Sequence, residues 1–368
     1  MEKVKLGEIF EYLPKSKFKA GDGKEKGKYK FFTSSNVQNK FIDKFIYDGE
    51  YLIFGTGGKA SINYCNDKFS TSTDNFVVKV NNEFNAKLIF LYFKNNMEIL
   101  EKGFKGASIK HISKEYINKL DIPKYNCQQQ INIVNKLDKV QDVIEMRKKQ
   151  IEKFDELIKS QFVEMFGDIK LNDKRWSSVD KIGNVCILNP KKSEIDGVAD
   201  IEVSFIPMQN VSEKGDINIS EIRQLSEVKK GFTYFRENDV LFAKITPCME
   251  NGKGAVAKGL KNNIGFGSTE FHVIRPTNKV NSVWIYTYTT FKSFRKEAER
   301  KMTGSAGQKR VPIRFFENYE IAIPPIELQN KFAEFVKQID KQKFEIQKSL
   351  EEMQLLQESL MNKYFGEM

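Results

Sequence analysis

The sequence repeats itself once along its length. The clearest match lies at the ends of the two copies, where residues 160–168 (SQFVEMFGD) align with residues 359–367 (SLMNKYFGE). The starts also match, because Val4–Ile9 (VKLGEI) resembles Asp180–Val185 (DKIGNV). An internal repeat of this length determines the architecture before any local pattern does. We therefore predict two halves of the same design, the second lengthened by additional loop residues.

Each half begins with a strand-rich part. Residues 1–124 alternate short apolar runs, such as Tyr51–Phe54, with glycine-rich turns, such as Gly55–Gly58. Short runs rich in aromatic and β-branched residues predict strands and hairpins, and one helix is expected among them. Residues 169–325 repeat this pattern, and prolines close both parts because they resist continuing a regular element. The sequence thus predicts two strand-rich globular domains, 1–124 and 169–325.

Each domain is followed by a long helical segment, residues 125–168 and 326–368, with apolar residues seven apart. Two narrow apolar stripes in one chain favour pairing as a coiled coil. The pairing must be antiparallel, because the chain passes through the second domain between the two helices. The fold class is then α+β with a pseudo-twofold repeat. The residues expected in this contact, the apolar seam, are Leu137, Ile144, Ile151 and Ile158 of the first helix and Ile339, Ile346, Met353 and Leu360 of the second.

Composition excludes several classes of protein. The formal net charge of +11 comes mostly from lysines scattered over both halves, which permits a polyanionic partner without establishing one. The four cysteines are far apart and the chain has two histidines, so we expect reduced thiols and no metal site. No signal peptide opens the chain, and no apolar run approaches the ~18 residues of a membrane span. We expect a soluble, cytoplasmic protein without membrane contact.

No motif in the sequence supports catalysis. A DNA amine methyltransferase needs an Asn/Asp-Pro-Pro-aromatic element, and Asn189–Lys192 (NPKK) lacks the second proline and the aromatic residue. The acid-x-Lys triplets Asp22–Lys24 and Glu227–Lys229 have no further acidic motif that would complete a nuclease metal site. Phe54–Lys59 is rich in glycine but does not match a phosphate-binding loop. We expect a protein that is not an enzyme by itself.

Two pairs of loops have the composition that DNA contacts require. The first pair is Gly57–Ser61 with Asn251–Gly254, and the second is Lys105–His111 with Thr303–Arg310. Small residues let the backbone approach DNA, cations bond phosphates, and Arg, Lys or Gln can bond base edges. A plain surface turn explains any single loop, but recurrence in both halves favours a shared role. The candidate DNA-contacting residues are Lys59, Ser61, Lys105, Ser108, Lys110, His111, Lys253, Ser305, Gln308, Lys309 and Arg310.

The order of these features resembles the specificity (S) subunit of type I restriction-modification systems. Each helix starts after an Ile-Pro pair followed by glutamine, Gln128 in the first copy and Gln329 in the second, and ends in Phe-Gly-Asp or Phe-Gly-Glu. The resemblance covers the whole chain. It implies that each domain is a target-recognition domain for one half of a bipartite double-stranded DNA sequence, and that the paired helices hold the two domains apart.

The same resemblance implies partners and cofactors. Two modification (M) subunits and restriction (R) subunits would carry out adenine methylation and cleavage. They would bind S-adenosylmethionine, magnesium and ATP, and this chain would bind no cofactor. One alternative is the recognition subunit of a type IIB-like system, whose partner fuses nuclease and methylase. A more distant alternative is a scaffold with two β-rich modules that bind protein or glycan, which salt-dependent binding to random duplex DNA would exclude.

Overall fold

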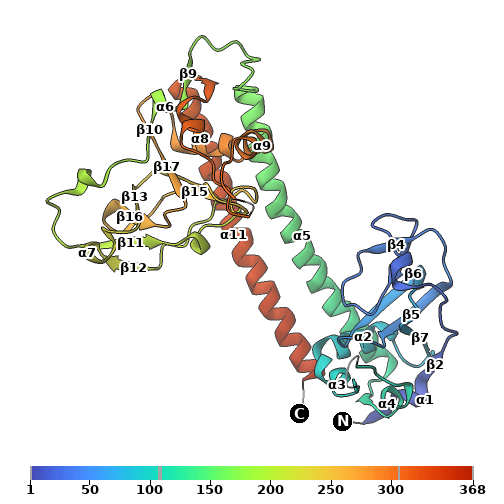
Figure 1. Cartoon of the computed structure of the whole chain (residues 1–368). Coiled ribbons are helices and arrows are strands. Elements are labelled where there is room, and N and C mark those ends of the chain that lie inside the picture. The colour runs from blue at the N-terminus through green and yellow to red at the C-terminus, as the bar shows by residue number, and fades with distance from the viewer. Residues whose placement is uncertain (1, 107–109, 306, 367–368) are drawn as a thin grey trace. The chain divides into compact units, whose positions relative to one another are not determined.

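The computed structural model describes residues 2–106, 110–305 and 307–366. The chain divides into two compact units, which are described separately below (Figure 1). Unit 1 consists of residues 1–149 and 347–368, and unit 2 of residues 150–346. Each unit combines one strand-rich domain with part of each long helix. The boundaries between the units therefore fall inside the helices.

Unit 1 is built on a six-stranded sheet in which only β3 (Tyr29–Phe32) and β6 (Ile62–Thr71) pair in parallel. Helices α2 (Ala86–Asn95) and α3 (Met97–Glu101) cover a core that includes Leu52, Phe54 and Phe93. The strands, in order across the sheet, are β2 (Phe10–Tyr12), β7 (Asn75–Val80), β5 (Tyr47–Gly55), β6 (Ile62–Thr71), β3 (Tyr29–Phe32) and β4 (Lys40–Ile42).

Unit 2 contains two four-stranded sheets. The helices of its domain are α6 (Ile182–Val185), α7 (Leu225–Val228), α8 (Ser282–Thr289), α9 (Lys292–Arg300) and α10 (Arg314–Glu317). The first sheet has the order β10 (Cys186–Leu188), β17 (Phe271–Pro276), β14 (Val240–Ala243) and β15 (Gly254–Val256). The second has the order β12 (Ile222–Gln224), β11 (Glu202–Ile206), β16 (Ile264–Gly267) and β13 (Thr233–Arg236).

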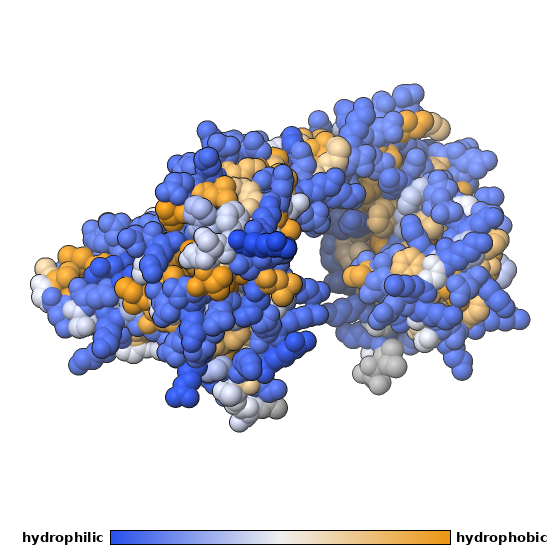
Figure 2. Space-filling view, turned by 90° about the horizontal axis from the view of Figure 1, so that it is seen from above, coloured by the Kyte–Doolittle hydropathy of each residue, from blue (hydrophilic) through white to orange (hydrophobic). Residues whose placement is uncertain are grey.

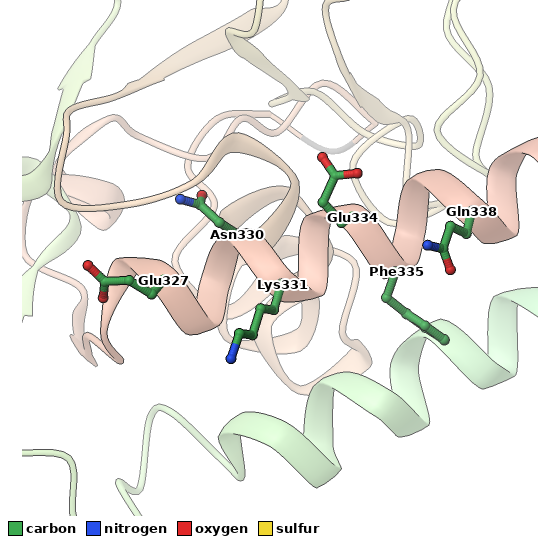
Figure 3. A pocket seen from close by; sticks show the side chains of 6 residues that line it. All are labelled: Glu327, Asn330, Lys331, Glu334, Phe335 and Gln338. Carbon is green, nitrogen blue, oxygen red and sulfur yellow. The ribbon is translucent and has the colours of Figure 1, made fainter.

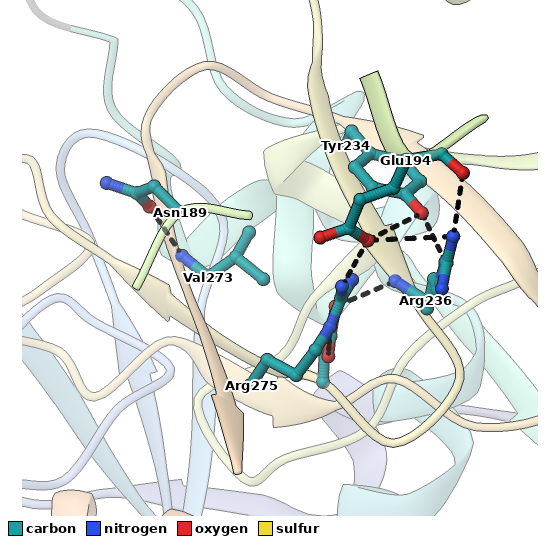
Figure 4. Close-up of polar contacts among 7 residues, drawn as sticks. Asn189, Glu194, Tyr234, Arg236, Val273 and Arg275 are labelled. Carbon is teal, nitrogen blue, oxygen red and sulfur yellow. Dashed lines mark hydrogen bonds and ion pairs between the residues drawn. The ribbon is translucent and has the colours of Figure 1, made fainter. Parts of the chain in front are cut away.

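An ion-pair network joins the two sheets of unit 2 (Figure 4). Arg275 of β17 donates from Nε and Nη2 to the carboxylate of Asp239, both at 2.8 Å, and from Nη1 to Glu194 Oε2 at 2.5 Å. The backbone amide of Arg236 in β13 also donates to Asp239. Asp239 is 1% exposed, and a buried carboxylate is costly unless it is paired in this way. The network therefore has a structural role.

The two units repeat the same opening motif. In unit 1, β1 (Lys3–Lys5) pairs with β8 (Asp121–Pro123), and α1 (Leu6–Ile9) contacts α4 (Lys114–Asn118). In unit 2, β9 (Val179–Lys181) pairs with β18 (Glu320–Ala322), and α6 contacts α10. This agreement in three dimensions confirms the repeat that the sequence predicted.

A glycine at the same place in both copies explains why the opening motif is retained. A Cβ at Gly7 would lie 3.0 Å from Cβ of Asn118, and a Cβ at Gly183 would lie 2.9 Å from Cα of Glu317. These distances are too short for a larger residue unless the neighbouring short helix moves. Both positions therefore require glycine for close packing of the two short helices.

A buried glutamine anchors the start of each long helix. Gln130 Oε1 accepts from the Asn85 amide at 2.7 Å, and its Nε2 donates to the carbonyl oxygens of Glu83 and Tyr125, both at 2.9 Å. Gln329 likewise accepts from the Asn281 amide at 2.9 Å. The partner of Gln329 in the repeat is thus Gln130, and the sequence alignment to the exposed Gln128 is wrong by two residues.

We expect Gln130→Ala to lower the free energy of unfolding by about 2–4 kcal/mol, because it leaves three backbone groups without a partner and opens a cavity. Gln128→Ala is the matched control, since Gln128 is exposed and two residues away; its effect should stay within about 0.5 kcal/mol. Denaturant unfolding of both variants checks this. Equal effects of the two substitutions would contradict the anchoring role.

The long helices are α5 (Cys127–Phe166) and α11 (Ile326–Phe365), each of 40 residues. In unit 1, Gln357 Nε2 donates to Gln141 Oε1 at 2.8 Å. In unit 2, Lys343 Nζ donates to Asp155 Oδ1 at 2.8 Å. A later residue of α11 thus meets an earlier residue of α5, which is the antiparallel sense. Pairing as a continuous coiled coil along the full helices stays a prediction.

The apolar seam is wholly or partly buried in both helices. Leu137, Ile144, Ile151 and Ile339 are at most 8% exposed, while the other members are half-buried. In unit 2 the rings of Phe162 and Phe332 are in contact, with centroids 5.4 Å apart. Apolar packing therefore extends beyond the seam to aromatic residues near the helix ends.

No helix in the described ranges is both long and apolar enough to cross a membrane.

Candidate nucleic-acid interface

Two loops meet in unit 1 at one end of the sheet. Loop A (residues 56–61) connects β5 to β6, and loop B (residues 105–111) precedes α4. Backbone hydrogen bonds join them to each other and to the chain before β7. The pairs, donor amide first, are Gly58 to Lys110 (3.1 Å), Ile112 to Thr56 (3.1 Å), His111 to Lys105 (2.9 Å) and Thr56 to Asp74 (2.9 Å).

The same four hydrogen bonds occur in unit 2. Here loop A is residues 244–253, between β14 and β15, and loop B is residues 303–310, before α10. The pairs, donor amide first, are Thr246 to Lys309 (3.0 Å), Val311 to Lys244 (2.9 Å), Arg310 to Thr303 (2.8 Å) and Lys244 to Glu270 (2.9 Å). In unit 1 these bonds join the two loop segments that the sequence analysis proposed. In unit 2 they join loop B to Lys244 and Thr246, at the start of loop A, and not to the proposed segment Asn251–Gly254.

These bonds correct the alignment of loop A between the copies. Gly58 corresponds to Thr246, since both amides bond the same place in loop B. At the far end of the loop, the Gly55 amide donates to the Ser61 carbonyl, as the Ala243 amide does to that of Lys253. Lys253 thus corresponds to Ser61 and not to Lys59. Loop A is longer in unit 2, and loop length had hidden the correspondence.

Most candidate DNA-contacting residues lie on the surface. Ser61 is an exception, because it is 3% exposed. Lys253 is half-buried, with Nζ 3.4 Å from the Met208 carbonyl oxygen. Ser108 lies outside the described residues. The exposed candidates are Lys59, Lys105, Lys110, His111, Ser305, Gln308 and Lys309, and Arg310 is partly exposed.

Loop B presents different side chains at one corresponding position. His111 Nδ1 lies 3.1 Å from the Thr56 carbonyl oxygen, which can only accept, so Nδ1 carries a proton. Arg310 instead forms a bidentate pair with Glu270, with Nε 2.9 Å from Oε2 and Nη2 2.8 Å from Oε1. The hydrogen bond to Arg310 holds the pKa of Glu270 below its usual value. The two units thus offer different hydrogen-bonding groups at the same place.

Arg295 of α9 is a structural residue that the sequence analysis missed. It is 7% exposed, and it donates to the carbonyl oxygens of Thr289 (2.7 Å), Met249 (3.0 Å) and Gly252 (3.1 Å). Burial lowers the pKa of its guanidinium to about 10. Two of these carbonyls belong to loop A, so Arg295 fixes that loop to α9. The available signal was an arginine on the apolar face of a helix, beside Phe294.

A hollow of ≈ 340 Å³ adjoins both loops of unit 2. Three cations and two carboxylates line it, together with Met302. The cations of α9 add positive charge to the Lys309 side of loop B, and this contribution was also missed from sequence. The charged residues are Lys296, Arg300, Lys309, Glu250 and Glu299.

A second hollow, of ≈ 430 Å³, follows the first turns of α11 (Figure 3). All its lining residues belong to that one helix. Lys331 and Phe335 point toward α5, whereas Asn330 and Glu334 point elsewhere. The polar groups do not converge, so this hollow lacks the geometry of a small-molecule site. In the described part of the chain, no three His, Cys, Asp or Glu side chains are grouped to hold a metal ion.

Hydrophilic residues dominate the face of the molecule that Figure 2 shows.

The fold and the duplicated loops define a class of protein with two strand-rich domains, each carrying the same cationic loop pair and each followed by a long helix. The profile of the family described as type I restriction modification DNA specificity domain matches residues 1–154 and 174–355. The chain belongs to this family.

Curated relatives carry the corresponding names. The chain is 41% identical over 192 residues to the type I restriction enzyme EcoAI specificity subunit of Escherichia coli, and 44% identical over 146 residues to the EcoEI specificity subunit. These matches cover 50% and 39% of the chain. They span 32% and 24% of the two relatives, so the chain spans about a third or less of their length.

Solved structures show the same fold. A type I restriction-modification S subunit from M. genitalium aligns with a TM-score of 0.62 at 15% identity, covering 100% of this chain and 96% of that one. A chain from a structure on complex assembly and conformational transition of the type I R-M system aligns with a TM-score of 0.53 at 16% identity, covering 99% and 97%. At these identities the likeness concerns the fold, and it confirms the predicted α+β architecture.

Proposed function

We propose that this chain is the DNA-recognition subunit of a type I restriction-modification complex. Each domain binds one half of a bipartite double-stranded DNA target through its loop A and loop B. The observation that carries the proposal is the duplication of one hydrogen-bonded loop pair, with exposed cations in both copies. Exposed cations bond the phosphates of DNA, while the side chains that differ between the copies allow the half-sites to differ.

The chain supplies recognition, and its partners supply the chemistry. We propose that two modification subunits and the restriction subunits assemble with it in the cytoplasm. S-adenosylmethionine, magnesium and ATP then bind to those partners, and this chain binds no cofactor. The family names of its curated relatives, specificity subunits of type I enzymes, support this division of roles.

The direct test is the distribution of methylated adenines in DNA exposed to the chain together with the modification subunit of its own system. We expect one bipartite sequence with a fixed non-specific spacer. Methylation without a bipartite sequence would contradict the proposal. A type IIB-like system gives the same methylation pattern, and the presence of a nuclease fused to the methylase distinguishes it.

We expect Lys59→Ala to weaken binding to all duplexes about equally, because Lys59 is exposed on loop A and exposed cations bond the DNA phosphates without reading the sequence. The slope of log affinity against log salt should fall by about one unit. Lys148→Ala, an exposed lysine on α5, is the control and should leave the slope unchanged. Affinities measured over a series of salt concentrations decide this, and an unchanged slope in Lys59→Ala would remove loop A from the interface.

A further inference from the structure

Arg310 is held in one orientation at the junction of loops A and B. Its Nε and Nη2 donate to the carboxylate of Glu270, and its Nη1 donates to the Gln308 carbonyl oxygen at 3.1 Å. Glu270 stands immediately before β17, and its carbonyl oxygen accepts from the Lys244 amide of loop A. The backbone of Glu270 is therefore fixed beside loop A, and its carboxylate orients the guanidinium.

The remaining donors of Arg310 suit a base edge. A guanidinium has five N–H groups, and these contacts use three of them. Within the described residues Nη1 and Nη2 each make one of these contacts, so each nitrogen keeps a second N–H for a ligand. Its side chain is 42% exposed. Two parallel donors match O6 and N7 of guanine in the major groove.

The charge of the pair argues against a phosphate contact. Glu270 lies beside two cations, Arg310 and Lys244, and its bidentate pair with Arg310 offsets much of the guanidinium charge. A phosphate contact depends on charge, whereas hydrogen bonds to a base edge depend on the geometry in which the pair holds Arg310. The corresponding His111 of unit 1 has no such fork, so the argument concerns unit 2 alone.

We propose that Arg310 recognises a guanine in the half-site bound by unit 2, and that Glu270 is the residue that positions it. The inference rests on the proposed DNA-recognition function and adds to it a specific base and a specific pair of residues. It assigns Gln308 a supporting role through its backbone carbonyl, in addition to any contact of its exposed side chain.

The experiment selects bound sequences from a pool of random duplex DNA, using the full chain with its modification subunit. Wild type should enrich a motif with a G·C pair at one position. Arg310→Ala and Arg310→Lys should both lose about ten- to a hundred-fold of the preference at that pair and keep the others. Arg310→Lys retains the positive charge but not the two parallel donors of the guanidinium. A loss of base preference in this variant therefore shows that hydrogen-bonding geometry, and not charge, is responsible.

The Glu270→Gln variant tests whether Glu270 positions Arg310 or only stabilises the fold. A residue that only stabilises the fold would not change the base preference and the salt slope in the way described next. The preference at the same base pair should weaken, while affinity for random duplex DNA rises and its salt slope increases by about one unit, because Arg310 becomes uncompensated. Glu221→Gln is the matched control, since Glu221 pairs with Arg223 in another sheet with Nε 3.0 Å from Oε1. It should change neither the motif nor the slope.

The outcomes separate the two proposals. An unchanged motif in the Arg310 variants, or loss of all positions at once, overturns the assignment of guanine while the recognition function stands. An unchanged motif and slope in Glu270→Gln overturns the positioning role. A wild-type complex that enriches no motif overturns the proposed function, and this inference with it. Thermal unfolding of each variant confirms that it is folded.

Discussion

Replacing residues 1–124 by the same region of another family member is expected to change one half of the DNA target completely and to leave the other half unchanged. The physical reason is that unit 1 has its own sheet, its own core and its own loop A and loop B. The reciprocal replacement of residues 169–325 should change the other half. Methylation mapping of both chimaeras gives the result.

The junction needs one precaution. Leu88 of α2 packs against Ile133 and Leu137 of α5, and Lys87 Nζ lies 2.6 Å from Asp138 Oδ2. A donor domain must therefore present an apolar residue at the place of Leu88, or bring its own first helical turns. Chimaeras that alter both half-sites together, although folded, would show that the domains do not recognise DNA independently.

Inserting seven residues into both long helices, after Lys149 and after Ile346, is expected to lengthen the spacer between the half-sites. These positions are the boundaries between the two compact units, so neither domain core is touched. Seven residues are about two helical turns and add about 10 Å, which is roughly three base pairs of DNA. The seven-residue repeat keeps the apolar seam in contact.

A single residue inserted into α5 alone is the matched control. It rotates the following seam residues by about 100° away from α11, and we expect loss of DNA binding and a lower unfolding temperature. Methylation mapping should show the original half-sites with a longer spacer for the double insertion, or an inactive complex if the added rotation about the DNA is not accommodated. Recovery of the original spacer with full activity would show that the helices do not set it.

The duplicated plan and the two long helices could be predicted from the amino-acid sequence alone. The expected segments 125–168 and 326–368 contain α5 and α11, because a heptad pattern is a local property that neighbouring residues specify. The loop segments were also predictable, since cations next to glycine stand out in any strand-rich background. Local patterns cannot fix which residue of one copy corresponds to which residue of the other when loops differ in length. For that reason the sequence alignment matched Gln329 with Gln128, whereas its counterpart in the structure is Gln130.

The accessibility and orientation of the loop residues could not be predicted from the sequence and became visible in the folded structure. Ser61 is buried at the end of loop A in unit 1, whereas the corresponding residue of unit 2 is the half-buried Lys253. The pairing of Glu270 with Arg310 joins residues far apart in sequence. Such contacts depend on how β17 and loop B pack together, and residue spacing along the chain carries no information about that. The orientation of the candidate DNA-contacting side chains therefore depends on tertiary packing. The duplicated plan, in contrast, is visible in the repeat and the heptad spacing of the sequence.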